Sequence, residues 1–106
     1  MINIATDFSR TPAGRYPKDG PSNGQRFRDE LLIPKLKSET IVEIQLDGAA
    51  GYPSSFLEEA FGGLVRLGVL SSKDAHARIK LVVNDPVYTR YVKAIWQHID
   101  SAVLSK

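Results

Sequence analysis

The chain has 106 residues, of which 42% are hydrophobic and 25% charged, a composition typical of one soluble globular domain. It contains no cysteine, which excludes disulfide bonds and thiolate metal sites, and it has no apolar run long enough to cross a bilayer. The net charge of +2 reflects 14 basic and 12 acidic residues mixed along the chain, so no concentrated basic stripe indicates nucleic-acid binding. We therefore expect a single cytoplasmic domain over residues 1–106, without a secretory signal.

The N-terminal part of the chain predicts a short strand, a long loop and a helix. Residues 2–5 alternate in a way typical of an edge strand. Residues 8–24 are rich in glycine and proline, which excludes a helix interior. A helix should begin near Ser22, where Ser22-Asn-Gly-Gln25 matches a capping box, and should kink or restart at Pro34.

The length of the loop over residues 8–24 makes it a candidate for a function, because structureless loops this long are uncommon in compact domains. Arg10, Arg15 and Lys18 lie among glycines whose amides can approach an anion closely, which favours an anion-binding role. The alternative is a mobile polar loop whose charges serve solubility, and no phosphate-loop signature is present to decide between them.

The segment after residue 40 predicts a strand that is buried on one side. Val42, Ile44 and Leu46 share one face, whereas Glu43 and Gln45 share the other with Ile41, so one side of the sheet should be only partly covered. The Asp-Gly pair that follows indicates a turn.

A helix should start after Pro53. Ser55-Phe-Leu-Glu58 matches a capping box, in which Ser55 caps the helix and Glu58 reaches back to it, so that Ser54 lies just outside the first turn. Gly62 and Gly63 each lower helix propensity by about 1 kcal/mol relative to alanine, which predicts a close approach to a neighbouring backbone.

The C-terminal part predicts a central strand over residues 79–83 and a last helix that ends near Leu104. Asp85 should cap this helix, with Pro86 at its first position. Strand, helix, strand and helix in this order imply a right-handed parallel crossover. We therefore expect an α/β fold with a mixed sheet of four or three strands and about three helices.

In such a fold, functional groups gather beyond the carboxyl ends of the strands. We expect a partner-binding surface there, around the serine pair. Its residues would be Asp47, Tyr52, Pro53, Phe56, Asn84 and Asp85.

Two segments resemble a known family. Tyr52-Pro-Ser-Ser-Phe-Leu-Glu-Glu-Ala-Phe-Gly, together with Asp7-Phe-Ser-Arg-Thr-Pro-Ala-Gly-Arg15, is similar to the STAS-like bacterial proteins of uncharacterised function, which look like a branch of the STAS domains. In the anti-sigma-factor antagonists of that larger group, an Asp-Ser-Ser-Gly motif stands between strand and helix. Its first serine is phosphorylated by a partner kinase of the histidine-kinase-like ATPase type. By position, the resemblance implies that Ser54 is the phosphoacceptor, although Pro53 and Phe56 replace the aspartate and glycine of the motif.

The leading hypothesis is therefore a non-enzymatic protein-interaction domain, switched by phosphorylation of Ser54 by a histidine-kinase-like ATPase or another serine kinase. A new phosphate would oppose Glu58 and Glu59, and Arg10 or Arg15 would compensate it. The competing interpretation of Ser54 is a plain turn residue, since strand-to-helix loops favour serine.

Other functions remain as alternatives. One is a phosphate- or nucleotide-binding module that uses the loop over residues 8–24 and the helix start at Ser55, and another is a small nucleic-acid-associated regulator. A serine hydrolase is disfavoured because Gly-x-Ser-x-Gly is absent. His76 and His98 are expected to be solvated or packed, and Glu58 and Glu59 to point in different directions. We expect no metal and no cofactor.

Overall fold

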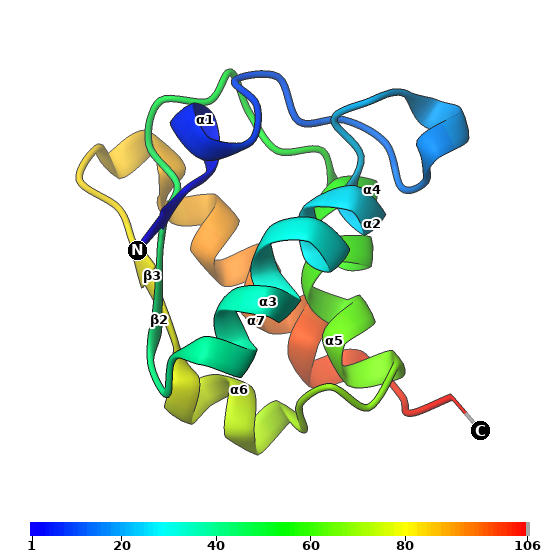
Figure 1. Ribbon diagram of the computed structural model, residues 1–106. Coiled ribbons are helices and arrows are strands. Elements are labelled where there is room, and N and C mark those ends of the chain that lie inside the picture. Colours follow the sequence, from blue (N-terminus) through cyan, green and yellow to red (C-terminus); the bar gives the residue numbers. More distant parts are fainter. Residues whose placement is uncertain (106) are drawn as a thin grey trace.

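The computed structural model describes residues 1–105 and contains one three-stranded sheet. Its strands are β1 (Ile2–Asn3), β2 (Val42–Gln45) and β3 (Ile79–Val82), in the spatial order β1-β2-β3, and both pairs are parallel. The α/β class is confirmed, and the sheet has the smaller of the two expected strand numbers (Figure 1). It is parallel throughout, however, whereas a mixed sheet was expected.

The helical segments are more numerous than the three expected, because short helices form at the N-terminus and before β3. Two long helices are each built from three consecutive segments. The helical segments are α1 (Ile4–Asp7), η1 (Pro17–Asp19), α2 (Gly24–Phe27), η2 (Arg28–Leu32), α3 (Ile33–Ser38), α4 (Ser54–Leu57), η3 (Glu58–Gly62), α5 (Gly63–Arg66), α6 (Ser72–Arg78), η4 (Pro86–Tyr88) and α7 (Thr89–Ser101). None of the helices in residues 1–105 is long and apolar enough to cross a membrane.

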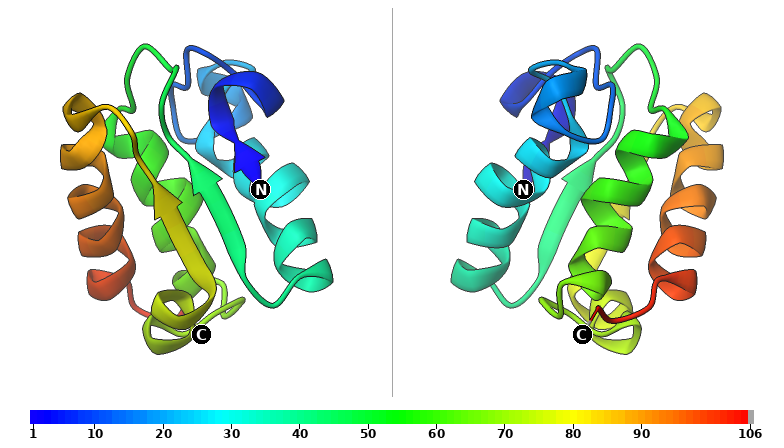
Figure 2. Two further views of the ribbon diagram at one scale, coloured as in Figure 1. Left: turned by 90° about the vertical axis from the view of Figure 1, so that its left-hand side faces the viewer. Right: turned by 90° about the vertical axis from the view of Figure 1, so that its right-hand side faces the viewer.

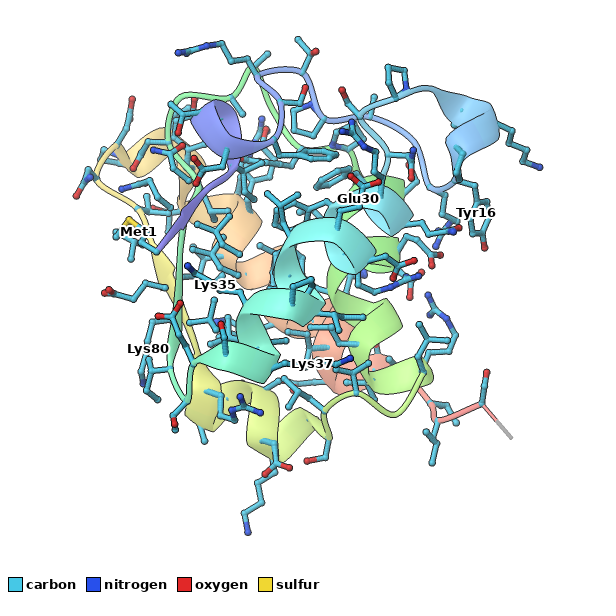
Figure 3. The ribbon with its side chains drawn as sticks, in the orientation of Figure 1. Met1, Tyr16, Glu30, Lys35, Lys37 and Lys80 are labelled. Atoms are coloured by element: carbon cyan, nitrogen blue, oxygen red, sulfur yellow. The ribbon has the colours of Figure 1, made fainter. Side chains whose placement is uncertain are left out.

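The long helices all lie on one side of the sheet, and the left-hand view of Figure 2 shows β2 and β3 in front of the helix that spans residues 54–66, with the short helix α1 beside them. Val42 and Ile44 of β2 point toward the helices and are at most 1% exposed, whereas Glu43 is exposed. Met1 and Lys80 extend from the sheet away from the helices (Figure 3). The prediction that one side of the sheet is only partly covered is confirmed.

The helix after the first loop begins and bends differently from the prediction. Its cap is Asn23, whose Oδ1 accepts a hydrogen bond from the amide of Arg26 at 2.9 Å, so the cap predicted at Ser22 is wrong by one residue. The chain does not break at Pro34. Instead, the π-helical segment η2 precedes it, because a wider turn tolerates the missing amide and the bulk of the proline ring.

The ends of the other elements follow from their capping residues. β1 is shorter than predicted because the side chain of Asn3 accepts from the amide of Thr6 at 3.3 Å and so starts α1. Asp85 caps η4 as predicted, since its Oδ1 accepts from the amide of Val87 at 3.0 Å. The last helix ends at Ser101 rather than near Leu104.

Candidate functional site

The polar residues that follow β2 and β3 meet at one edge of the sheet. The carboxylate of Asp47 accepts hydrogen bonds from the backbone amides of Asn84 at 2.8 Å and Asp85 at 2.9 Å. This clamp joins the two loops at the carboxyl ends of the strands. Asn84 and Asp85 are exposed, as a partner-binding surface requires.

The serine pair lies apart from the Asp47 clamp, because the chain between Asp47 and Ser54 runs along the helical segment that begins at η4 and continues as α7. Tyr88 donates a hydrogen bond to the carbonyl of Ala49 at 2.5 Å, and the hydroxyl of Ser54 lies 3.5 Å from Nε2 of His98. Ten helical residues separate Tyr88 from His98, which corresponds to about 15 Å along a helix. Ser54 therefore does not join the Asp47 clamp.

Ser54 is the first residue of α4, and its side chain is exposed. The first intrahelical hydrogen bond runs from the amide of Leu57 to the carbonyl of Pro53 at 3.1 Å. The amides before Leu57 precede the hydrogen-bond ladder, so they have no acceptor within the helix. Ser54 thus presents a hydroxyl to solvent beside free amides.

The predicted capping box at Ser55 and Glu58 is wrong. The helix is capped by Pro53, whose φ of −60° and ψ of 148° bring the chain into the helix without any side-chain cap. Ser55 therefore lies inside the first turn, where its hydroxyl cannot act as an N-cap. Glu58 does not turn back toward the helix start, because Arg66 donates to its carboxylate at 2.7 Å.

Two residues of the predicted partner surface belong instead to the core. Phe56 is 0% exposed, and its ring centroid lies 5.9 Å from that of Phe27 and 6.1 Å from that of Phe8. Tyr52 is 5% exposed, and its hydroxyl donates to the carbonyl of Leu46 at 2.7 Å. Burial raises the pKa of the Tyr52 hydroxyl, which stays protonated. Only Pro53 of this segment's predicted partner residues is exposed.

A shallow groove of about 300 Å³ runs between α4 and α7 beside Ser54. Its lining combines aromatic and aliphatic side chains with one cation: Tyr52, Ser54, Leu57, Arg90, Tyr91 and Ala94. Sequence reasoning missed Arg90 and treated His98 as solvated or packed. Neither residue could be connected to Ser54 before the packing of α7 on α4 was known.

Glu58 and Glu59 face the same group of arginines, contrary to the prediction that adjacent residues point apart. Nη2 of Arg66 donates to Oε1 of Glu58 and to Oε1 of Glu59, each at 3.3 Å. Both glutamates lie in the π-helical segment η3, where the wider turn changes the angle between consecutive side chains. Arg15 reaches both carboxylates from the loop.

The buried part of this cluster is an ion pair between Arg28 and Glu59, which are 5% and 6% exposed. Nη1 of Arg28 donates to Oε2 of Glu59 at 2.6 Å and to its backbone carbonyl at 2.9 Å. A Cβ at Gly63 would lie 2.5 Å from the same Nη1, so the close approach expected at that glycine is made by an arginine side chain. We call Arg15, Arg28, Glu58, Glu59 and Arg66 the arginine–glutamate network.

The pKa of Glu58 lies below its usual value of 4.5. Burial acts to raise this pKa, but the hydrogen bonds that the carboxylate accepts from Arg66 and Arg15 lower it by more. The same hydrogen bond from Arg15 to Glu58 raises the pKa of Arg15. The hydrogen bonds that Glu58 accepts from Arg66 and Arg15 thus favour the charged forms of all three side chains.

The basic residues of the loop do not gather into an anion site. Arg15 forms salt bridges with Glu58 and Glu59, and Lys18 lies on η1. Arg10 is exposed, and its backbone carbonyl accepts a hydrogen bond from the amide of Ala50 at 2.7 Å. A second shallow groove beside the serine pair is lined by the middle of the loop, residues 11–13, together with residues 50–53 and Tyr91. The loop reaches the helix start through small residues, not through its cations.

Nothing in residues 1–105 groups three or more histidine or acidic side chains in a way that could hold a metal ion. His76 lies on α6, where its ring stacks on Trp96 of α7 with 4.2 Å between the ring centroids and its Nε2 lies 2.8 Å from Oδ1 of Asp100. It is packed against the surface rather than placed at a site.

Comparison with known protein families gives one match. A family model described as a STAS-like domain of unknown function matches residues 23–87, which is more than half of the chain and includes the strand, the serine pair and the helix that follows. Comparison with curated proteins and with solved structures gives no match.

Proposed function

We propose a regulatory function from one premise: the chain belongs to the family of STAS-like domains of unknown function. In this proposal the domain is not an enzyme but binds a protein partner through the exposed surface around Ser54. Phosphorylation of Ser54 changes that surface. The kinase is a histidine-kinase-like ATPase or another serine kinase of the cytoplasm, as the resemblance to anti-sigma-factor antagonists implies.

The observation that carries the proposal is the position of Ser54. Ser54 is exposed and stands at the first position of α4, and the one hydrogen-bonding group that its hydroxyl approaches among residues 1–105 is Nε2 of His98, at 3.5 Å. A kinase needs such an accessible hydroxyl, and a helix N-terminus tolerates the added negative charge.

The residues that depart from the antagonist motif have structural roles here. Pro53 sets the backbone that leads into α4, and Phe56 fills the aromatic core beneath it. Both fix the position of Ser54 without covering it. The departures therefore do not remove the feature on which the switch depends.

Phosphorylation would act on binding rather than on folding. A phosphate adds about −1.5 to −2 charges at neutral pH, and Ser54 contributes no contact that the core needs. A partner surface that carries negative charge would then be repelled, at a cost of several kcal/mol for like charges brought together. The domain would release its partner while it stays folded.

The test is incubation of the protein with ATP and a candidate kinase, followed by intact-mass measurement and mapping of the phosphate. We expect one added phosphate on Ser54. Ser54→Ala should abolish it, whereas Ser55→Ala, one residue further along the same helix, should leave it unchanged. No mass increase, or a phosphate on another serine, contradicts the proposal.

The alternative of a phosphate- or nucleotide-binding module has less support. The groove at residues 11–13 and 50–53 lies beside the helix start, but Arg15 is held by Glu58 and Glu59 and supplies no free charge there. Thermal unfolding in the presence of a nucleotide panel separates the two functions. A docking domain should show no increase in melting temperature, whereas a nucleotide site should show one that rises with concentration.

A further inference from the structure

We propose that His98 and Arg90 form a receiving site that holds the phosphate on Ser54 against α7. This inference rests on the proposed function and names how the modified side chain is placed. It replaces the expectation that Arg10 or Arg15 compensates the new charge, because Arg15 is bonded to Glu58 and Glu59.

His98 is at the right distance for a phosphoserine and too far for a strong bond to the unmodified side chain. Its Nε2 lies 3.5 Å from the Ser54 hydroxyl oxygen, beyond the 2.7–3.2 Å range of good N–H···O bonds. Phosphoryl oxygens project two bonds beyond the serine oxygen. They therefore reach a ring that the hydroxyl alone only approaches.

The position of His98 is fixed by backbone packing. A Cβ at Gly62 would lie 3.3 Å from the backbone carbonyl of His98, so this glycine permits the close contact between α7 and η3. His98 is itself half-buried. The imidazole is thus presented to Ser54 by a rigid element, which lowers the entropic cost of capturing the phosphate.

Arg90 supplies a positive charge to the groove beside Ser54. Arg90, Ala94 and His98 follow one another at four-residue intervals, so they share one face of α7, and Arg90 and Ala94 line the groove together with Ser54. The Arg90 guanidinium lies 4.7 Å from the Tyr91 ring centroid and donates to its hydroxyl at 2.7 Å.

The charge of Arg90 is uncompensated, in contrast to that of Arg15. Arg90 forms no salt bridge with any residue in 1–105. Glu58 and the carbonyl of His98 both lie close to Gly62, but the Glu58 carboxylate is bonded to Arg66 and Arg15. Lys93 is exposed on the same helix and adds no negative charge.

Capture of the phosphate joins α4 to α7 across the mouth of the groove. Charge-assisted bonds from imidazolium and guanidinium are stronger than neutral ones and favour the protonated ring. The phosphate then covers the apolar floor formed by Leu57 and Ala94. A partner that inserts an apolar side chain there is excluded by occupancy as well as by charge.

The test uses protein in which phosphoserine is placed at position 54 during translation, so that no kinase is needed. The pKa of His98 is measured by NMR titration of its ring nitrogens and compared with that of the unmodified protein. A matched control carries phosphoserine at position 55. We expect the pKa of His98 to rise by about 1 with phosphoserine at 54, and to rise less with phosphoserine at 55. His76, which contacts Trp96 and Asp100 rather than Ser54, serves as the internal reference and should show no change in either protein.

A second measurement follows removal of the phosphate by a nonspecific phosphatase. Arg90→Gln and His98→Gln should each speed dephosphorylation of phosphoserine 54 about three- to tenfold, whereas Lys93→Gln should not. An unchanged pKa of His98, or equal rates in all variants, overturns the receiving site. Failure of every kinase to modify Ser54, with the rise in pKa still present, refutes the proposed function but not this geometry.

Discussion

The helix that begins at Ser54 has two regions of opposite character, one turn apart. At its start, Ser54 is exposed and has a single long contact with His98, and Arg90 nearby carries an uncompensated charge. One turn later, Glu58 and Glu59 are enclosed by arginines that satisfy both carboxylates. The second region is richer in charge, yet the first has more capacity to bind something new.

The difference teaches that charge alone does not mark a site. The arginine–glutamate network joins the loop at Arg15, the first long helix at Arg28 and the second at Arg66, so its charges hold three segments together. A buried ion pair is costly to break but adds little net stability over an apolar pair, because desolvation offsets the attraction. Such a network specifies an arrangement, whereas the free groups at Ser54 are available to a partner.

The largest effect should come from Glu59→Gln. It removes the buried partner of Arg28 and leaves this buried arginine only the solvent-exposed carboxylate of Asp29, which should lower the free energy of unfolding by about 3 kcal/mol. Urea denaturation measures the loss. The matched control is Glu30→Gln, which breaks the exposed pair with Arg26 and should cost less than about 1 kcal/mol. Equal losses in the two variants would mean that Arg28 is solvated and that the network is no more than a surface cluster.

The next effect should come from Gly63→Ala. Helix propensity alone predicts a gain of about 1 kcal/mol for alanine, but the new methyl would lie 2.5 Å from Nη1 of Arg28 and push it from Glu59. We expect a net loss of about 1–2 kcal/mol, as in other overpacked sites. The double variant with Glu59→Gln should lose less than the sum of the two, because both act on the same ion pair. A gain in stability, or strict additivity, would contradict this account.

The fold could be predicted from the sequence wherever a local pattern decided the structure. The alternation over residues 42–46 gave a strand with one buried face, and Asp85 with Pro86 gave the start of the last helix. The sequence patterns of a capping box are present at Ser22 and Ser55, but neither serine caps a helix in the structure. Asn23 is a better cap one residue later, and Pro53 already sets the backbone before Ser55.

The site was less predictable because its groups meet only through packing. The exposure of Ser54 followed from its place between a strand and a helix. Arg90 and His98 come from a helix more than thirty positions further along, and the approach of Arg15 to Glu58 depends on how the loop folds. The π-helical turns at η2 and η3 left no signal in a 3.6-residue period, so the convergence of Glu58 and Glu59 could not be seen either.

A smaller effect should appear in the pH dependence of stability. The pKa of Glu58 is lower in the folded protein than its usual value of 4.5, so its contribution is fully present above that pH and is lost as the pH falls toward the folded pKa. Glu58→Gln should therefore flatten the fall in stability below about pH 4.5, which urea denaturation at a series of pH values would measure. An unchanged slope would place this carboxylate in solvent rather than in the network.

The smallest effect on stability should come from Ser54→Ala, and this is what separates the two regions most clearly. The hydroxyl of Ser54 makes one long hydrogen bond, at 3.5 Å, and caps no helix, so its removal should change the free energy of unfolding by less than about 0.5 kcal/mol. Ser54→Asp should be equally well folded, because a negative charge is tolerated at a helix start. Urea denaturation of both variants, with Ser55→Ala as the neighbouring control, measures this. A loss above about 1 kcal/mol would show that Ser54 holds the helix in place. Such a residue is poorly suited to a switch, because a switch must change its charge without unfolding the domain.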